Sequence, residues 1–138
     1  MSKLFLKLVS SIHTALYRAT GGTFGGTTKN VPILLLTVKG RKTGKQRTTP
    51  LMYGRDGGNL VLIASVGGAP HHPAWYHNLK GEQAEVQIGK ERRRVRARDA
   101  EGEERERLWS QMVESYPTYA EYQKKTTRRI PVVVLEPA

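Results

Sequence analysis

The chain of 138 residues suits a single domain, 1–138, long enough to bury a core without metal or disulfide support. Its lack of cysteine excludes disulfides, zinc–thiolate sites, iron–sulfur clusters and thiol catalysis. A transmembrane helix needs about 20 consecutive apolar residues, and no stretch of the chain comes near that length. No secretory signal is recognisable either, so we expect a cytoplasmic protein.

The net charge of +11 is concentrated at the start of the chain. Residues 1–55 contain ten lysines and arginines and no acidic residue, whereas bases and acids nearly balance after that point. Such a segment favours an anionic partner, which could be nucleic acid, an acidic membrane surface or a polyanionic ligand. The alternative is a solvated basic surface that only aids solubility.

Residues 3–19 are predicted to form a helix, because apolar residues such as Leu4, Leu8 and Ile12 recur at a spacing of four. This helix could pack on the domain. Its basic and apolar character could also hold it against an anionic membrane, at the inner face of the cell membrane. Glycines within residues 21–26 then predict a flexible connector.

The rest of the chain alternates strand signals with turns and three helix signals. Apolar or alternating runs predict strands at residues 33–38, 48–53, 60–66, 84–88, 92–97 and 130–135. Helical patterns cover residues 73–79, 101–114 and 119–126. Four arginines at alternating positions would share one face of a strand: Arg92, Arg94, Arg96 and Arg98. We therefore expect an α+β fold with a mainly antiparallel sheet, curved into a small barrel.

The strongest anion-binding signal is the turn at residues 40–47. Its two glycines let backbone N–H groups approach a ligand closely, and Arg41, Lys42 and Arg47 supply positive charge. The same turn could grip the phosphates of a nucleic acid. The residues alone leave these two interpretations open.

Three stretches carry a resemblance to a known family: VKGRKTGKQRTTPLMYGRDGG (residues 38–58), IASVGGAPHHPAWYHNL (63–79) and YPTYAEYQKKTTRRIPVVVLEP (116–137). In this order and spacing the chain resembles the deazaflavin-dependent nitroreductase family, over about residues 31–137. The resemblance implies an enzyme with a split β-barrel, related to flavin-mononucleotide-binding oxidoreductases. Its cofactor would be 8-hydroxy-5-deazaflavin, coenzyme F-420, whose phosphate and glutamate tail would account for the basic turn.

The cofactor residues of that family map onto four parts of this sequence. The anionic tail would lie on Arg41, Lys42, Thr43 and Arg47. Along the following strand the cofactor would contact Thr48, Thr49, Pro50, Leu51 and Met52. The ring system would contact Ala64, Ser65 and Val66, and would be covered by Ala74, Trp75, Tyr76, Asn78 and Tyr119.

The resemblance also implies catalytic and substrate-binding residues. Ser65 would tune the ring by a hydrogen bond, and Tyr119 or a water would protonate the product. Spaced three apart, Tyr116, Tyr119 and Tyr122 would form a substrate wall with Met52, although such tyrosines serve equally well as packing aromatics. Some relatives carry tyrosine where this chain has Met52, which leaves the substrate preference open.

The leading hypothesis is hydride transfer from reduced deazaflavin to a small electron-poor acceptor: a quinone, an activated alkene or lactone, or a nitroaromatic. A flavin-mononucleotide-binding redox protein and a nucleic-acid-binding module are the alternatives. The basic turn lacks the stacking aromatics of single-strand binders, so we expect no nucleic-acid partner. His71, His72 and His77 lie close together, but no nearby carboxylate completes a site, so we expect no metal. The oligomeric state is not predicted.

Overall fold

The computed structural model describes residues 27–28, 31–79 and 83–138. The helix predicted at residues 3–19 and the glycine connector after it lie outside this part of the chain. Within the described residues, no helix is long and apolar enough to cross a membrane.

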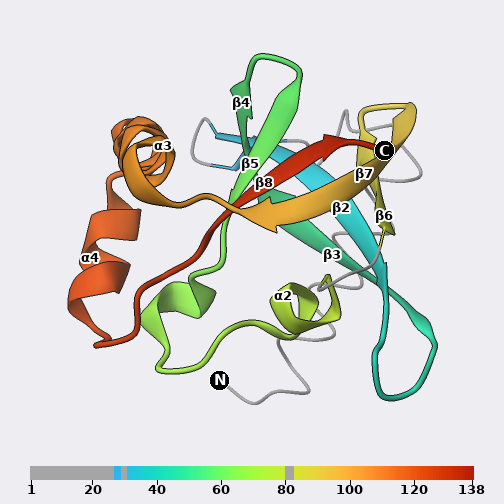
Figure 1. Cartoon of the computed structure of the whole chain (residues 1–138), viewed down its shortest axis with the longest axis horizontal. Coiled ribbons are helices and arrows are strands. Elements are labelled where there is room, and N and C mark those ends of the chain that lie inside the picture. The colour runs from blue at the N-terminus through green and yellow to red at the C-terminus, as the bar shows by residue number, and fades with distance from the viewer. Residues whose placement is uncertain (1–26, 29–30, 80–82) are drawn as a thin grey trace.

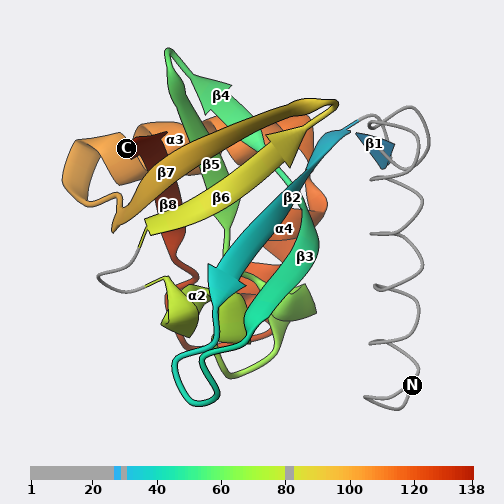
Figure 2. The ribbon, with the colours of Figure 1, turned by 90° about the vertical axis from the view of Figure 1, so that its right-hand side faces the viewer.

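One curved antiparallel sheet forms the body of the domain (Figures 1 and 2). Its strands are β1 (Thr27–Thr28), β2 (Val31–Lys39), β3 (Gln46–Met52), β4 (Gly54–Asp56), β5 (Asn59–Ile63), β6 (Gln83–Ile88), β7 (Glu91–Asp99) and β8 (Val132–Pro137). The order along the sheet is β2–β6–β7–β8–β5–β4, and β1 and β3 both pair with β2. Because β3 pairs with no second strand in the described chain, the barrel stays open, as a split barrel does.

Strand β2 is buried on both faces of the sheet. Leu34, Leu36 and Val38 are buried in the barrel core, whereas Ile33 and Leu35 are buried in a small cluster on the other side. A strand that is buried on both faces has a continuous apolar sequence, and that signal predicted β2 correctly.

The β6–β7 hairpin carries the alternating arginines. It turns at Gly89, whose φ of 60° is costly for residues with a side chain. In β7 Val95 is buried while Arg94 and Arg96 beside it are exposed. The even-numbered arginines therefore lie on the outer face, as predicted.

The described helices are α2 (Ala74–Asn78), α3 (Gly102–Ser115) and α4 (Thr118–Lys124). Helices α3 and α4 cover the side of β5 and β8 that faces away from the barrel core (Figure 1). They build a second apolar cluster with these strands: Val61, Ile63, Leu108, Met112, Tyr116, Tyr119, Ile130, Val132 and Val134. Helix α2 lies beside the turn end of the β2–β3 hairpin in both views (Figures 1 and 2).

Several predicted element ends differ from the structure by two or three residues. The strand predicted at residues 60–66 ends at Ile63, because the next turn, η1 (Val66–Gly68), begins with a φ of 45° that no extended strand contains. The helix predicted to reach Thr126 ends at Lys124, because the Thr126 hydroxyl accepts a hydrogen bond in the turn that follows.

The last strand also begins later than predicted, at Val132 instead of Ile130. The N–H of Ile130 donates to the side-chain oxygen of Gln123, at 3.0 Å, and Pro131 has no N–H to offer a neighbouring strand. The remaining predicted elements agree with the structure to within two residues at each end.

Candidate functional site

A cavity of about 280 Å³ opens at the seam where β3 and β5 do not pair with each other. Its walls are mostly apolar and come from distant parts of the chain: Ile33, Pro50, Leu51, Met52, Leu62, Ile63, Ser65, Trp75 and Tyr119. The structure thus brings together six of the predicted cofactor residues: Pro50, Leu51, Met52, Ser65, Trp75 and Tyr119. An apolar slot with aromatic walls and a few polar groups suits a planar ring system.

The predicted anion turn joins β2 to β3. Two backbone hydrogen bonds of 2.8 Å close it, from the N–H of Gly40 to the carbonyl of Lys45 and from the N–H of Gly44 to the carbonyl of Gly40. Gly44 has a φ of 71°, a left-handed angle that favours glycine. The tip of the turn leaves Arg41 and Lys42 exposed to solvent.

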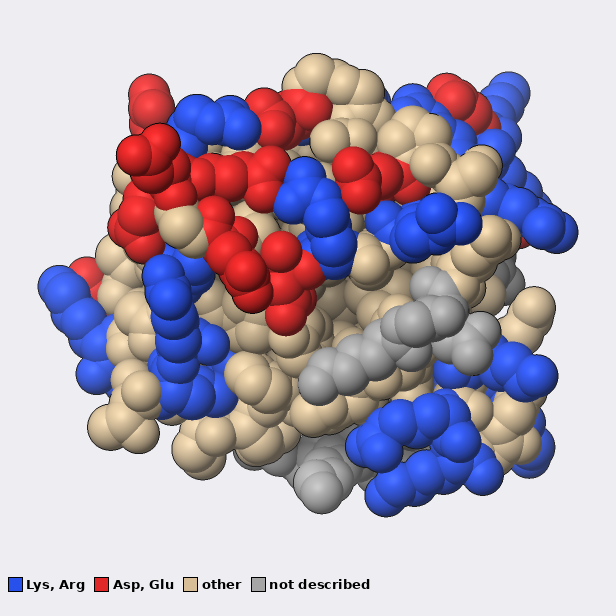
Figure 3. Space-filling view, viewed as in Figure 1, with Lys and Arg blue, Asp and Glu red and all other residues tan. Residues whose placement is uncertain are grey.

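Within the described residues, the positive charge of this turn is not neutralised by acidic side chains. In the part of the chain that the structure describes, no carboxylate pairs with Arg41, Lys42 or Arg47. Acidic side chains gather over α3 instead, at the upper left of Figure 3, while the basic hairpin lies at the lower right. The positive electrostatic potential of the turn can therefore attract an anionic ligand.

The cavity and the basic turn are linked through helix α2. The N–H of Arg41 donates a hydrogen bond of 3.1 Å to the side-chain oxygen of Asn78, which is 8% exposed. Trp75, one helical turn earlier, lines the cavity. Strand β3 provides a second link, because it begins at the turn and its far end lines the cavity. The two regions are thus structurally connected.

Ser65 lies at the start of the η1 turn, on the cavity wall. Its side chain is nearly buried, and its N–H donates to the carbonyl of Ile63 at 3.0 Å. The next residue, Val66, has a φ of 45°, which is a strained angle for a β-branched residue. A backbone held in this way presents Ser65 at a fixed place on the wall.

The three predicted substrate-wall tyrosines do cluster. The ring centroids of Tyr116 and Tyr119 are 5.0 Å apart, and Tyr122 lies 6.5 and 6.4 Å from them. Of the three, only Tyr119 lines the cavity, and Tyr116 and Tyr122 pack against it in the second apolar cluster. Burial, and then the neighbouring tyrosines, raise the pKa of Tyr119 well above its usual range. Its hydroxyl therefore stays protonated at neutral pH.

Tyr76 has a structural partner that the sequence did not reveal. Its hydroxyl donates a hydrogen bond of 2.6 Å to Asp99 at the end of β7. Burial, followed by this carboxylate, raises the pKa of Tyr76 to about 12. The ring belongs to the barrel core and is not among the cavity-lining residues. In this structure Tyr76 anchors α2, the helix that presents Trp75.

The remaining predicted cofactor residues are not among those that line the cavity. Thr43, Arg47, Val66 and Ala74 are exposed, Thr48 and Thr49 are half-buried, and Ala64 is fully buried. The hydroxyl of Thr48 forms a hydrogen bond of 2.8 Å with that of Thr37 across to β2. Cofactor contacts by this group stay predictions.

Sequence reasoning missed two kinds of site residue. Ile33, Leu62 and Ile63 line the cavity, but in sequence they are indistinguishable from ordinary core residues of a strand. Only the open seam gives them access to a ligand. The second omission is Arg128, whose guanidinium donates to backbone carbonyls next to the cavity. In sequence it belongs to a run of bases that resembles a solvated turn.

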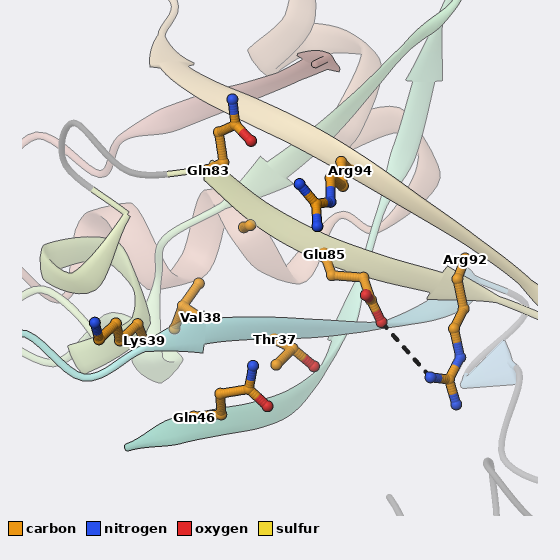
Figure 4. Close-up of a pocket in the computed structure, with 9 residues that line it drawn as sticks. Thr37, Val38, Lys39, Gln46, Gln83, Glu85, Arg92 and Arg94 are labelled. Atoms are coloured by element: carbon orange, nitrogen blue, oxygen red, sulfur yellow. Dashed lines mark ion pairs between the residues drawn. The ribbon is translucent and has the colours of Figure 1, made fainter. Parts of the chain in front are cut away.

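A second hollow, of about 470 Å³, lies on the outer face of the sheet (Figure 4). Its lining is polar and comes mainly from β2, β6 and β7: Thr37, Val38, Lys39, Gln46, Gln83, Ala84, Glu85, Arg92 and Arg94. Arg92 lies 3.9 Å from Glu85, as the dashed line in Figure 4 marks. Because its described lining includes no aromatic side chain and little apolar surface, this hollow does not suit a planar ring.

The histidines of the 70–77 loop form no recognisable metal site. In the described residues, no three histidine, aspartate or glutamate side chains are grouped as ligands of a metal ion. The rings of His72 and His77 have centroids 5.7 Å apart, and Nδ1 of His72 lies 2.8 Å from the guanidinium of Arg128. A cationic neighbour at that nitrogen disfavours metal binding there.

An open antiparallel barrel with an apolar cavity at its seam and a basic turn beside it defines a split-barrel protein whose site suits a planar, anionic cofactor. A sequence model of the family described as F420H(2)-dependent quinone reductase matches residues 9–137. The chain belongs to this family.

Known relatives support the assignment. The chain is 42% identical to an F420H(2)-dependent quinone reductase of Mycobacterium tuberculosis strain H37Rv, with 90% of this chain and 87% of the relative covered. A solved F420-H2 dependent reductase (FDR-A) shares 48% identity and a TM-score of 0.70, over 76% of this chain and 94% of that one. HutZ, the heme storage protein of Vibrio cholerae, has a TM-score of 0.56 at 15% identity, over 77% of this chain and 81% of that one, which is a likeness of fold alone.

Several predictions are confirmed at the level of the family. The split barrel, the enzymatic nature of the chain and coenzyme F-420 as the family's cofactor all agree with the resemblance found in the sequence. The matching family is named for quinone reduction, so nitroaromatics and activated alkenes or lactones stay predictions as acceptors.

Proposed function

We propose that this protein reduces quinones with coenzyme F-420 as the electron donor. When bound in its reduced form, that coenzyme supplies a hydride. The proposal rests on one observation: strand β3 and helix α2 connect an apolar cavity with aromatic walls to a basic turn that no described carboxylate neutralises. Each region suits one half of a ligand that is planar at one end and polyanionic at the other.

The residues present fit both halves of the coenzyme. Ligand pockets usually measure roughly 300–1,000 Å³. At about 280 Å³ the cavity suits the ring system and not the whole coenzyme. The phosphate and glutamates would lie outside it on Arg41, Lys42 and Arg47, where arginine can bind a phosphate through two hydrogen bonds. Because three residues of extended strand span about 10 Å from Arg47 to Pro50, one ligand can reach both regions.

The cavity residues would bind and orient the reactants. Trp75 offers a flat surface beside the ring, and Ser65 offers a hydroxyl for a hydrogen bond. Tyr119 keeps its proton at neutral pH, so it can donate a hydrogen bond to a quinone oxygen. Apolar walls exclude water, which leaves the rate dependent mainly on alignment of donor and acceptor.

The acceptor would sit at the mouth of the cavity, since the cavity holds little more than one ring system. Met52 and Tyr119 line the cavity from opposite parts of the chain, β3 and α4. Met52 offers a polarisable apolar surface and no hydrogen-bond donor. This lining favours flat, apolar acceptors such as quinones. Nitroaromatics and activated lactones share that shape, and we propose them as secondary substrates.

The test is a fluorescence titration of the protein with coenzyme F-420 at low and high salt, followed by turnover with menadione. We expect the Arg41→Ala, Lys42→Ala double variant to lose about tenfold or more in affinity at low salt, because two charge-assisted contacts are lost. A double variant with the same loss of charge, Lys90→Ala, Arg92→Ala, lies on the far hairpin and should bind like the wild type. Absence of binding by the wild type would overturn the proposal.

Peripheral membrane contact through residues 3–19 is a separate proposal that rests on sequence alone. Deleting these residues should release the protein from anionic phosphatidylserine vesicles and leave F-420 binding unchanged. Vesicle binding that survives the deletion would contradict it.

A further inference from the structure

Arg128, in the connection between α4 and β8, donates hydrogen bonds to four groups of one segment. Its Nη2 donates to the carbonyls of Ala64 and Ser65, at 3.1 and 2.9 Å, and its Nε donates to that of Ala69 at 2.9 Å. Its Nη1 lies 2.8 Å from Nδ1 of His72. Because a guanidinium accepts no hydrogen bond, this Nδ1 is the acceptor and the ring proton of His72 is on Nε2.

This arrangement differs from that of the other arginines with several hydrogen bonds. Arg98 and Arg107 each donate two hydrogen bonds to a carboxylate, of Glu104 and Asp56 respectively. No carboxylate in the described chain pairs with Arg128. Its planar guanidinium instead donates to three carbonyls and an imidazole of residues 64–72. The single ammonium group of a lysine cannot contact all four.

The segment that Arg128 holds is strained and needs such support. Val66 has a φ of 45°, and Gly68 has a φ of 83°. A Cβ added to Gly68 would lie 2.9 Å from the carbonyl oxygen of Tyr122 in α4, so the turn is pressed against that helix. Strained backbone persists only where the surroundings determine it.

Arg128 is itself fixed by its own turn. The side-chain nitrogen of Gln123 donates to the carbonyl of Arg128 at 2.8 Å, and its oxygen accepts from the N–H of Ile130 at 3.0 Å. The N–H of Arg128 donates to the hydroxyl of Thr126 at 3.2 Å. The guanidinium is thus presented from a connection that is tied to α4, the helix that carries Tyr119.

We propose that Arg128 is a positioning residue of the coenzyme site, which fixes the Ser65 wall of the cavity relative to the Tyr119 wall. The inference rests on the proposed function for the identity of the ligand. The contacts predict that loss of the guanidinium loosens residues 64–72, displaces Ser65 and misaligns donor and acceptor. A misplacement of about 1 Å at a reacting centre can cost about a hundredfold in rate.

The test compares Arg128→Gln and Arg128→Lys with the matched controls Arg129→Gln and Arg129→Lys. Arg129 is the exposed neighbour, 3.3 Å from the exposed Glu106. In the coenzyme-free protein, we expect the amides of Gly68 and Ala69 to exchange hydrogen at least about tenfold faster in both Arg128 variants. With F-420 and menadione, kcat should fall about 30- to 100-fold. The affinity for F-420 should change less, because the basic turn is intact, and the Arg129 variants should match the wild type.

Several outcomes would overturn the inference. Unchanged exchange of residues 64–72 in the Arg128 variants would show that the guanidinium does not hold the segment, and faster exchange with wild-type kcat would show that it positions nothing. If Arg128→Gln does not fold, Arg128→Lys, which keeps the charge and a long stem, decides by the same two measurements. If the wild type neither binds F-420 nor reduces menadione, the proposed function fails, while the exchange comparison still tests the contacts of Arg128.

Discussion

Two loops flank the cavity, and they are built in opposite ways. The turn at residues 40–47 exposes Arg41 and Lys42 to solvent with no described carboxylate beside them. The segment at residues 64–72 is strained and is held by four hydrogen bonds from Arg128. The first loop acts through charge and the second through position. One site can thus capture a polyanion at long range and still align a ring at short range.

Substitutions in the two loops are therefore expected to have different effects on binding and catalysis. Changes in the basic turn should alter the affinity for F-420 and its dependence on salt, because dissolved ions screen exposed charges over about 10 Å at 0.1 M salt. Changes in the 64–72 segment should alter stability and kcat, because its contacts are short and partly buried.

The largest contrast is expected between two glycine substitutions. Gly68 and Gly44 both have a positive φ, 83° and 71°. A Cβ on Gly68 would lie 2.9 Å from the Tyr122 carbonyl oxygen, whereas the nearest atom to one on Gly44 is a flexible Lys39 carbon at 3.7 Å. Gly44→Ala should cost about 1 kcal/mol of unfolding free energy, from the left-handed angle alone. Gly68→Ala should cost about 3 kcal/mol, because strain and a backbone clash add.

Urea unfolding of the two variants, with the wild type beside them, measures this contrast. Equal losses of stability would mean that the 64–72 turn is no more tightly supported than the basic turn.

A smaller effect is expected from Ser65→Ala, the mildest change on the positioned wall. Losing one hydroxyl at the cavity should lower kcat with menadione by about tenfold, with the salt dependence of F-420 affinity unchanged. Stopped-flow oxidation of reduced F-420 by menadione gives the rate. A Ser65→Ala variant that changed F-420 affinity and its salt dependence, as the Arg41→Ala, Lys42→Ala variant does, would contradict the separate roles of the two loops.

Asn78 lies between the two loops, and two substitutions separate its effects. Asn78→Ala removes the acceptor for the N–H of Arg41 and should cost about 1 kcal/mol of stability. Asn78→Asp keeps an acceptor but adds a negative charge beside the basic turn, so F-420 affinity should fall about threefold to tenfold at low salt and recover as salt rises. Isothermal titration at two salt concentrations distinguishes them. An Asn78→Asp variant that binds F-420 more tightly would contradict the electrostatic role of the turn.

The smallest effect is expected from alkaline pH. The pKa of Tyr76 is raised from 10.0 to about 12, so the folded state holds its proton while the unfolded chain loses it. The stability from Tyr76 is therefore complete below about pH 10 and is lost as pH rises toward 12. The urea midpoint should fall over that range, and Tyr76→Phe should reduce the slope. Tyr119 and Tyr122, whose pKa values are also raised, should contribute to the remaining slope. Identical slopes in wild type and Tyr76→Phe would contradict the assignment.

The sequence predicted the longer strands of the sheet, because each of these is marked by an apolar run or by alternation between defined turns. The short strands β1 and β4 carry no such signal and were not predicted. The sequence also predicted the basic turn, since glycines and arginines there are local signals. The cavity was found only partly. Residues such as Ile33 and Ile63 become site residues because β3 and β5 do not pair, and no local pattern states that.

The contacts that tune the site were not predictable for the same reason. Arg128 reaches Ser65 across 63 residues of sequence, and Tyr76 reaches Asp99 across 23. Such partners depend on how the barrel brings distant segments together. The strand that was predicted to run through Val66 shows the same limit, because the left-handed angle there is imposed by tertiary contacts and not by the valine itself.

The most direct test of the central claim is to compare two ligands with the wild-type protein: coenzyme F-420 and its ring fragment, 8-hydroxy-5-deazaflavin without phosphate or glutamates. Fluorescence titrations at low and high salt would measure both affinities. If the cavity holds the ring and the basic turn holds the tail, the fragment should bind more weakly and independently of salt, and the full coenzyme should bind more tightly and lose affinity as salt rises. Equal affinities with the same response to salt would contradict the account.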